Sequence, residues 1–160
     1  MRLVHLARGL GQLGHRDQVR LTAAWSLLGL SRLAILVLPF AVVRRALGEH
    51  HVPVAPSEQP APPLDEAATV RARRISASVQ LAARHTPWRS ECYPQALTAR
   101  VLLGLARVPH VVSFGVRRDG DELVAHAWVH AAGLTVTGGT GHRYTEVGAF
   151  AWAPRARKGG

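Results

Sequence analysis

The sequence predicts an α+β fold, in which helices pack on a small antiparallel sheet. Two patterns support this: apolar residues recur at helical spacing as far as Arg107, and from His110 onward they alternate as they do in strands. Helices that precede strands, without regular alternation of the two, are typical of this fold class. A chain of 160 residues, 48% of them apolar, is long enough to bury the core of one such domain.

The most hydrophobic region, Leu21–Gly48, is predicted to form a helical pair that packs on the rest of the domain or on a partner protein. Pro39 is expected to kink or break the helix. The apolar stretch is long enough to span a bilayer. However, Arg32 near its centre costs roughly 2.5–3.5 kcal/mol, against about 0.3–0.6 kcal/mol gained per large apolar residue. Membrane contact through residues 21–48 therefore stays open as an alternative to packing.

A long helix is predicted from Leu64 to near His85. Asp65 or Glu66 favours its start through the helix dipole, and Pro87 disfavours helical geometry at the residue before it. The residues expected on its inner face are Val70, Ile75, Val79, Ala82 and Ala83.

A second helix is predicted over Tyr93–Arg107, with Cys92 at or just before its first residue. Pro94 fits the first turn, where its missing N–H would be unpaired in any case. The apolar residues that recur at helical spacing are Leu97, Val101, Leu102 and Leu105.

Three strands are predicted to follow, over His110–Arg117, Leu123–His130 and Leu134–Thr137. Asp119-Gly120 and Ala132-Gly133 are the turn signals that join them. A turn at Ala132-Gly133 would place residue 131 opposite 134, and His126 opposite Gly139 and diagonal to Thr137. Residues 140–150 are expected to be less regular. The predicted organisation is a helical extension (1–48), a Pro-rich linker (49–63), a catalytic domain (64–152) and a basic tail (153–160).

The charge of the chain is strongly positive, formally +10, and it is unevenly distributed. Between Ala67 and Arg118 the only acidic residue is Glu91, against nine arginines. Such a surface attracts an anionic partner. No recognised nucleic-acid motif accompanies the charge, so no nucleic-acid partner is predicted, and an acidic peptide or a partner protein would fit the surface equally well. A solvated face that only aids solubility is the alternative. His50 and His51 lack the spacing of a chelating pair, and no metal site is predicted.

The only cysteine, Cys92, lies where a loop is predicted to turn into a helix. Unpaired amides and the helix dipole favour a thiolate there, and the thiolate is the nucleophile in cysteine chemistry. His126 lies on a predicted strand and could serve as the base. A Cys at a helix start with a His on a strand is the arrangement of thiol catalysis, although a buried Cys and a structural His are the alternative.

Three segments, Trp88–Leu97, Val111–Arg118 and Ala125–Val129, resemble the leader peptidase of lasso-peptide biosynthesis, a transglutaminase-like cysteine protease family. The motifs are Cys-x-Pro-x-Ala-Leu and His-Ala-Trp-Val, and the resemblance covers roughly residues 67–152. The run Leu21–Gly48 is also similar to the family's N-terminal helices.

This resemblance implies a transglutaminase- or papain-like core and removal of the leader from a ribosomal precursor peptide, with no cofactor. It also implies two further partners, a separate leader-recognition protein and an ATP-dependent lasso cyclase. One cysteine excludes an intramolecular disulfide and fits a reducing cytoplasm. We therefore expect a cytoplasmic protein, peripheral to the membrane if residues 21–48 touch it.

A catalytic triad needs a third group that orients the imidazole. The resembled family usually has an Asp twelve residues after the His, and here that position is Gly138. The chain has no asparagine, and Glu146 is the only carboxylate after His126. We expect Thr137 or the Gly138-Gly139 backbone to orient His126, since Glu146 would have to fold back over the hairpin. Gly138→Asp would restore a carboxylate if the glycine is not needed for its backbone angles.

The remaining candidates for substrate contact are Trp88, Gln95 and Trp128. Gln95 could donate to an oxyanion, or could simply be a first-turn residue on the surface. The residues alone imply only thiol acyl chemistry. Two other functions therefore stay open, an acyltransferase of the same fold and a non-catalytic scaffold that presents the peptide.

Overall fold

The computed structural model describes residues 14–39, 42, 49–51, 65–88, 90–139 and 141–154. Most of these residues lie in helices or strands. The helices are α2 (His15–Val37), α4 (Glu66–Arg84), α5 (Cys92–Leu105) and the short 3-10 helix η1 (Gly141–Arg143); the strands are β1 (Glu49–His51), β2 (His110–Asp119), β3 (Glu122–Ala131), β4 (Leu134–Thr137) and β5 (Thr145–Trp152).

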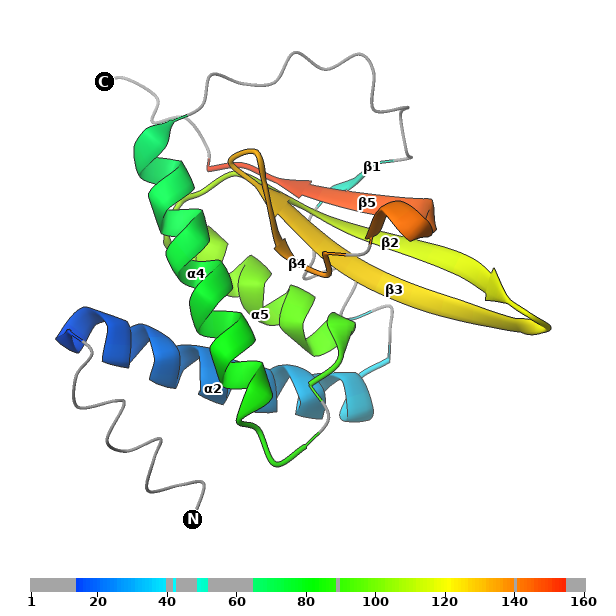
Figure 1. Ribbon diagram of the computed structural model, residues 1–160, viewed down its shortest axis with the longest axis horizontal. Coiled ribbons are helices and arrows are strands. Elements are labelled where there is room, and N and C mark those ends of the chain that lie inside the picture. Colours follow the sequence, from blue (N-terminus) through cyan, green and yellow to red (C-terminus); the bar gives the residue numbers. More distant parts are fainter. Residues whose placement is uncertain are drawn as a thin grey trace.

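The strands form one antiparallel sheet in the order β1-β5-β2-β3-β4. Helices α4 and α5 contact the sheet, and α2 packs against these two helices (Figure 1). The core lies between these layers, where apolar residues of all three helices meet the helix-facing side of the sheet. The predicted α+β class is therefore confirmed.

Helix α4 begins where its sequence provides a cap. The Asp65 side chain accepts a hydrogen bond from the Ala67 amide at 2.9 Å, which satisfies one of the first unpaired N–H groups. The helix ends at Arg84, close to the predicted end. Its buried face consists of Ala68, Ala72, Ile75, Val79 and Ala82. Val70, expected on that face, is 41% exposed, because small alanines rather than a valine form the contact with the other helices.

Helix α5 starts at Cys92, one residue before the predicted start. Its buried residues are Pro94, Ala96, Thr98, Ala99, Leu102 and Leu103. Leu105 and Val101, two of the apolar residues that recur at helical spacing, are 76% and 36% exposed. The helix lies among α2, α4 and the sheet, so small side chains dominate its buried surface.

The two predicted turns are present. Asp119 pairs with Glu122, and Ala131 pairs with Leu134, so each turn has two residues. Ala132 and Gly133 both have positive φ, 48° and 73°, as a hairpin turn that matches the strand twist requires.

Strands β1 and β5 correct two predictions. Residues 145–152 lie in a regular strand between β1 and β2, although residues 140–150 were expected to be irregular. A register shift at Phe114/Gly115 interrupts the alternation of β5, which hides the strand in the sequence. Residues 49–51, assigned to the linker, form the edge strand β1, because their backbone pairs with β5. The rest of the predicted linker lies outside the described residues.

Helix α2 packs on the domain, as one of the predicted alternatives stated, and ends at Val37, two residues before Pro39. Leu21, Ala24 and Leu28 are buried in the common core. The Ser31 hydroxyl lies 3.3 Å from that of Thr98 in α5. By length and composition alone this helix could also cross a membrane, a test that core helices of soluble proteins pass too. Of the second predicted helix of the pair, only Val42 lies within the described residues.

We expect Leu28→Ala to lower the free energy of unfolding by about 2–5 kcal/mol, because Leu28 is fully buried between α2 and the other helices. The matched control is Leu33→Ala on the same helix, which is 57% exposed and should change stability by less than about 0.5 kcal/mol. Urea denaturation followed by circular dichroism measures both. Equal effects of the two variants would show that α2 does not belong to the core.

His110 gives the fold a dependence on pH. It begins β2, is 4% exposed, stacks on Trp152 with ring centroids 5.2 Å apart, and its Nδ1 lies 2.9 Å from the Val108 carbonyl oxygen. Burial lowers the pKa of His110 below its usual value; the hydrogen bond to Val108 opposes this and the charge of Arg100 adds to it.

Because the folded protein then binds fewer protons than the unfolded chain, its stability should fall as the pH drops below about 6.5. We expect His110→Phe, which keeps a ring against Trp152, to lose less stability than the wild type between about pH 7.5 and pH 5.5. The exposed His85→Phe is the control. Urea midpoints at the two pH values decide, and equal losses in wild type and His110→Phe would contradict this account.

Candidate active site

Cys92 is the first residue of α5 and is partly buried against the core. Amides in the first turn of a helix have no partner within the helix, so they lie close to the thiol and can stabilise negative charge there. The cap residue, Glu91, makes no side-chain hydrogen bond to the helix start. The position therefore matches the predicted one for a nucleophile.

The loop before Cys92 is held by side chains. The Thr86 hydroxyl lies 2.8 Å from that of Ser90 and 3.1 Å from the Ala83 carbonyl oxygen. The side-chain amide of Gln95 donates to the Ser90 carbonyl oxygen at 2.7 Å. Gln95 thus ties α5 to the loop, a role not predicted from the sequence.

Trp88, in the same loop, packs on α2. Its ring centroid lies 5.2 Å from that of Trp25, and a Cβ at Gly29 would approach the Trp88 ring to 3.2 Å. The loop and α2 therefore support each other. A contact between Trp88 and substrate stays a prediction.

His126 lies on β3, on the side of the sheet that faces away from the helices. Its neighbour Ala127 belongs to the helix-facing core, and side chains alternate along a strand. The imidazole stacks on Tyr144 with ring centroids 4.6 Å apart, and more loosely on Trp128 at 6.1 Å. Trp128 is only 6% exposed, so its ring is a packing surface here, and its predicted contact with substrate stays a prediction.

One nitrogen of His126 is oriented by the backbone. Nε2 lies 3.4 Å from the Gly138 carbonyl oxygen, at the long end of the hydrogen-bond range. A carbonyl oxygen only accepts, so a hydrogen bond here requires the proton of the neutral ring to be on Nε2, with the lone pair on Nδ1. The Gly138 backbone therefore contacts the nitrogen that a carboxylate would orient in a catalytic triad.

Thr137 does not share this role in the structure. The predicted pairing of Ala131 with Leu134 is present, but a register shift between Val129 and His130 brings Thr137 opposite Val129. Thr137 therefore lies on the helix-facing side, buried to 2% exposure. Its hydroxyl has no hydrogen-bond partner among the described residues.

Glu146 belongs to the sheet rather than to an irregular loop. It pairs with Gly115 on β2, and Gly115 pairs with His126, so one strand lies between the two residues. Burial lowers the pKa of His130, and the charge of Glu146 acts in the opposite direction. The electrostatic effect of Glu146 is thus felt at His130, and a contact with His126 stays a prediction.

The start of α5 lies over the part of the sheet that carries His126. The Tyr93 ring meets the Phe114 ring edge-on at 5.5 Å, and Phe114 pairs with Ala127. The thiol and the imidazole nevertheless approach from opposite sides of the sheet. No hydrogen bond joins them among the described residues.

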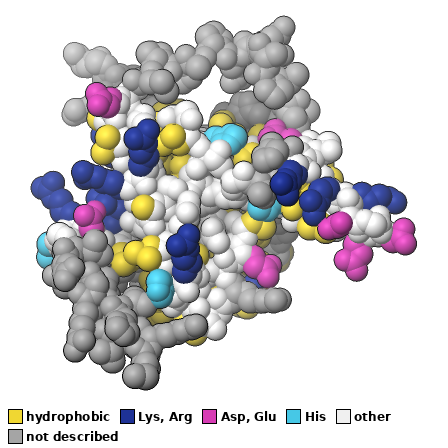
Figure 2. All heavy atoms as spheres, viewed as in Figure 1, with side chains coloured by type: hydrophobic (Ala, Val, Ile, Leu, Met, Phe, Trp, Pro, Cys, Tyr) yellow, Lys and Arg dark blue, Asp and Glu magenta, His cyan; other side chains and the backbone are white. Residues whose placement is uncertain are grey.

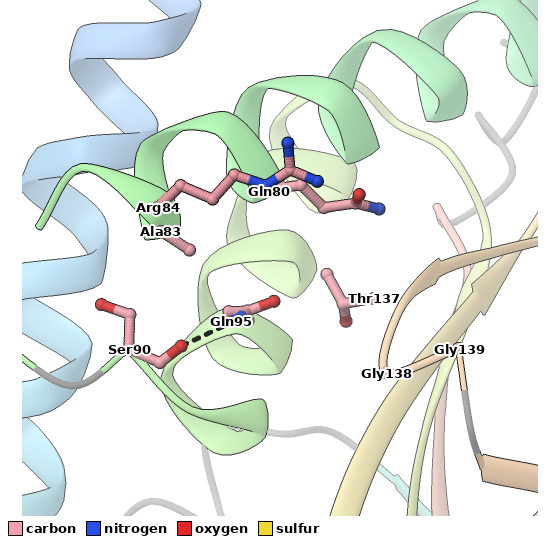
Figure 3. A pocket seen from close by; sticks show the side chains of 8 residues that line it. All are labelled: Gln80, Ala83, Arg84, Ser90, Gln95, Thr137, Gly138 and Gly139. Carbon is pink, nitrogen blue, oxygen red and sulfur yellow. Dashed lines mark hydrogen bonds between the residues drawn. The ribbon is translucent and has the colours of Figure 1, made fainter.

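A pocket of about 430 Å³ opens beside the nucleophile loop (Figure 3). In it, Gln80 and Gln95 extend from α4 and α5 toward Thr137 at the end of β4. Cys92 is not part of the lining, but Ser90 and Gln95 on either side of it are. The lining residues are Gln80, Ala83, Arg84, Ser90, Gln95, Thr137, Gly138 and Gly139.

Within the part of the chain that the structure describes, no group of three or more His, Cys, Asp or Glu residues is arranged to hold a metal ion.

Known protein families offer a comparison for this fold and site. Residues 34–149, well over half of the chain, match the family model of the transglutaminase-like superfamily. The matched range includes both Cys92 and His126. No curated protein and no solved structure matches the chain.

Gly138 cannot accept a side chain in this structure. Its φ is +71°, and a Cβ would lie 2.5 Å from the Ala127 carbonyl oxygen and 2.6 Å from the Trp128 Cβ. The glycine is thus needed for its backbone angles, and the condition under which Gly138→Asp would restore a carboxylate is not met.

We expect Gly138→Asp to lower the free energy of unfolding by about 1–3 kcal/mol or more. The strain of a non-glycine residue at positive φ and the clash of its Cβ with Ala127 and Trp128 both destabilise the variant. Gly139→Asp is the matched control, because a Cβ there has no neighbour within 4 Å. Thermal unfolding of the two variants compares them. If Gly138→Asp were as stable as Gly139→Asp, the backbone at Gly138 would not be constrained as described.

Proposed function

Because the chain belongs to the transglutaminase-like superfamily, we propose that it is a cysteine peptidase with Cys92 as nucleophile and His126 as general base. The superfamily typically contains cysteine proteases and acyltransferases, which share a thioester intermediate. The observation that carries the proposal is the position of Cys92 as the first residue of α5, inside the matched range, because the unpaired amides of a helix start can stabilise the negative charge that develops in thiol acyl chemistry.

In the proposed reaction, Nδ1 accepts the proton of the Cys92 thiol, and the thiolate attacks the carbonyl carbon of the scissile peptide bond. The backbone N–H of Cys92, at the helix start, is a suitable donor to the resulting oxyanion. The C–N bond then breaks, and the imidazolium protonates the leaving amine. Water, deprotonated by the same imidazole, hydrolyses the thioester.

The proton transfer requires the imidazole to leave its stack on Tyr144, because the ring lies on the far side of the sheet from Cys92. The pairing of β4 with β3 covers only Val129–Ala131, so the edge of β3 at His126 lies beyond the paired region. We place the active rotamer of His126 at this edge.

The proposed substrate is a ribosomal precursor of a lasso peptide, from which the enzyme removes the leader. Support comes from the motifs Cys92-x-Pro94-x-Ala96-Leu97 and His126-Ala127-Trp128-Val129, which resemble those of lasso leader peptidases. The partners of the reaction would be a separate leader-recognition protein and an ATP-dependent lasso cyclase. The site of action would be the cytoplasm, with α2 as a surface for a partner or a membrane.

A second candidate is a non-catalytic scaffold that presents the precursor to the cyclase. Two observations favour it: Gly138 replaces the orienting carboxylate, and the imidazole stacks on Tyr144 rather than meeting the thiol. Alkylation by iodoacetamide separates the candidates, because an activated Cys92 reacts faster than a free thiol of ordinary pKa. An amine added to the reaction would reveal acyl transfer through the mass of the product.

We expect Cys92→Ala and His126→Ala each to slow leader removal by about 10² or more, and the double variant to be no slower than either one, because the two groups act as a unit. The measurement is mass spectrometry of the precursor incubated with the protein and the leader-recognition protein.

His130→Ala, on the same strand and the same face as His126, is the matched control and should process normally. Circular dichroism confirms that the variants fold. If Cys92→Ala removed the leader at the wild-type rate, the peptidase proposal would be wrong.

A further inference from the structure

A groove runs between α4 and the edge strand β4, and it is larger than the pocket beside Cys92 alone. A second pocket of about 320 Å³, lined by Arg73 and Thr135 among others, shares Gln80 with the first. Together the two pockets form what we call the α4–β4 groove. Arg84 lies at the end near the nucleophile loop and Arg73 at the other. Arg84 comes eleven positions after Arg73, which corresponds to about 16 Å of helix, enough for several residues of an extended peptide.

The lining of the α4–β4 groove favours an acceptor-rich, negatively charged ligand. Neither pocket contains a carboxylate, and the formal charges that line them are those of Arg73 and Arg84. Both arginines are exposed, and neither is in an ion pair with a described residue. In contrast, Arg71 on the same helix pairs with Asp65 at 3.5 Å. Figure 2 shows basic side chains over α4, and acidic ones gathered with basic ones at the tip of the β2–β3 hairpin.

Thr137 gives the groove an unused hydrogen-bond donor. Its residue is 98% buried, its hydroxyl has no partner among the described residues, and it lines the pocket into which Gln80 and Gln95 extend (Figure 3). A buried hydroxyl without a partner is costly, and a ligand that accepts a hydrogen bond there would remove that cost.

The carbonyl end of α4, which would repel a carboxylate, is already occupied. His85 Nδ1 lies 2.8 Å from the Leu81 carbonyl oxygen, the His85 amide donates to Ala82, and the Thr86 hydroxyl donates to Ala83. Glu91 is the acidic residue nearest in sequence to this end of α4; it is exposed and does not line the groove. The electrostatic potential in the groove is therefore positive and is determined by Arg73 and Arg84.

From these observations we infer that the α4–β4 groove binds an acidic segment of the substrate peptide, with carboxylates toward Arg73 and Arg84 and an acceptor at the Thr137 hydroxyl. The inference rests on the proposed function, since it takes the ligand of the groove to be the peptide whose adjoining bond reaches Cys92. A peptide so bound would pass beside Ser90 and Gln95 into the nucleophile loop.

The test measures binding without cleavage. The full chain carrying Cys92→Ala is titrated into a fluorescein-labelled peptide of alternating Glu and Gly, and into the same peptide with Gln for Glu, by fluorescence anisotropy at low and high salt. We expect the Glu peptide to bind at least about tenfold more tightly at low salt, and salt to reduce this preference.

Variants locate the binding site. Arg84→Gln and Arg73→Gln should each weaken binding of the Glu peptide by about three- to tenfold, as loss of a partly exposed charge pair does. Arg71→Gln removes the same charge from the same helix outside the groove and should change binding by less than about twofold. Thr137→Val alters no charge, so it should weaken binding of the Glu peptide while leaving thermal stability unchanged or raised. The control Thr145→Val, exposed on β5, should leave binding of the Glu peptide unchanged.

Equal losses for Arg71→Gln and Arg84→Gln, or no preference for the Glu peptide, would overturn the inference by showing only diffuse attraction. Displacement of the Glu peptide by a single-stranded oligonucleotide that binds more tightly and depends on Arg84 would overturn it in favour of nucleic acid. Leader removal by a protein that does not bind the Glu peptide would contradict the inference about the groove but not the peptidase proposal. Binding of the Glu peptide without leader removal would contradict the peptidase proposal but not peptide binding in the groove.

Discussion

The packing of Trp128 against glycines is the constraint on which the candidate site depends. A Cβ at Gly115, Gly138 or Gly141 would lie within 3 Å of Trp128 atoms, so these three segments can approach the Trp128 ring, or its Cα and Cβ in the case of Gly138, only because they lack side chains there. This close approach holds the chain after β4 against β3. It also aims the Gly138 carbonyl at His126 and covers the face that carries both rings. The geometry of the histidine thus depends on the packing of Trp128.

Much of the fold could be predicted because its signals are local. The capping carboxylate of Asp65 and the helical spacing after it predicted α4, and the turn residues Asp119-Gly120 and Ala132-Gly133 predicted the hairpins. The strands β1 and β5 could not be predicted, because their pairing joins residues distant in sequence. In β5, Gly148, Ala149 and Ala151 dilute the apolar alternation that identifies a strand.

In the candidate site, too, the features set by local sequence could be predicted, and those set by distant residues could not. The place of Cys92 at a helix start follows from Pro94 and the apolar spacing behind it, and the face shared by His126 and Trp128 follows from alternation along β3. Which of the two faces meets the helices depends on how Ala127 and Val129 pack against residues of α5, and no local pattern contains that information. Thr137 was expected beside His126, and a shift of one residue in pairing moved it to the other face. A single bulge therefore decided between two candidates for the same role.

Helix α2 bears on where the functional unit begins. The family match starts at residue 34, yet Leu21, Ala24 and Leu28 are part of the core, and Trp25 supports the Trp88 ring in the loop that leads to Cys92. Ser31 adds a buried polar contact to Thr98, on the helix that begins with Cys92. A chain trimmed to the matched range would keep every residue proposed for chemistry and lose the layer that holds the nucleophile loop from behind. The family boundary and the structural boundary of this protein therefore differ by most of one helix.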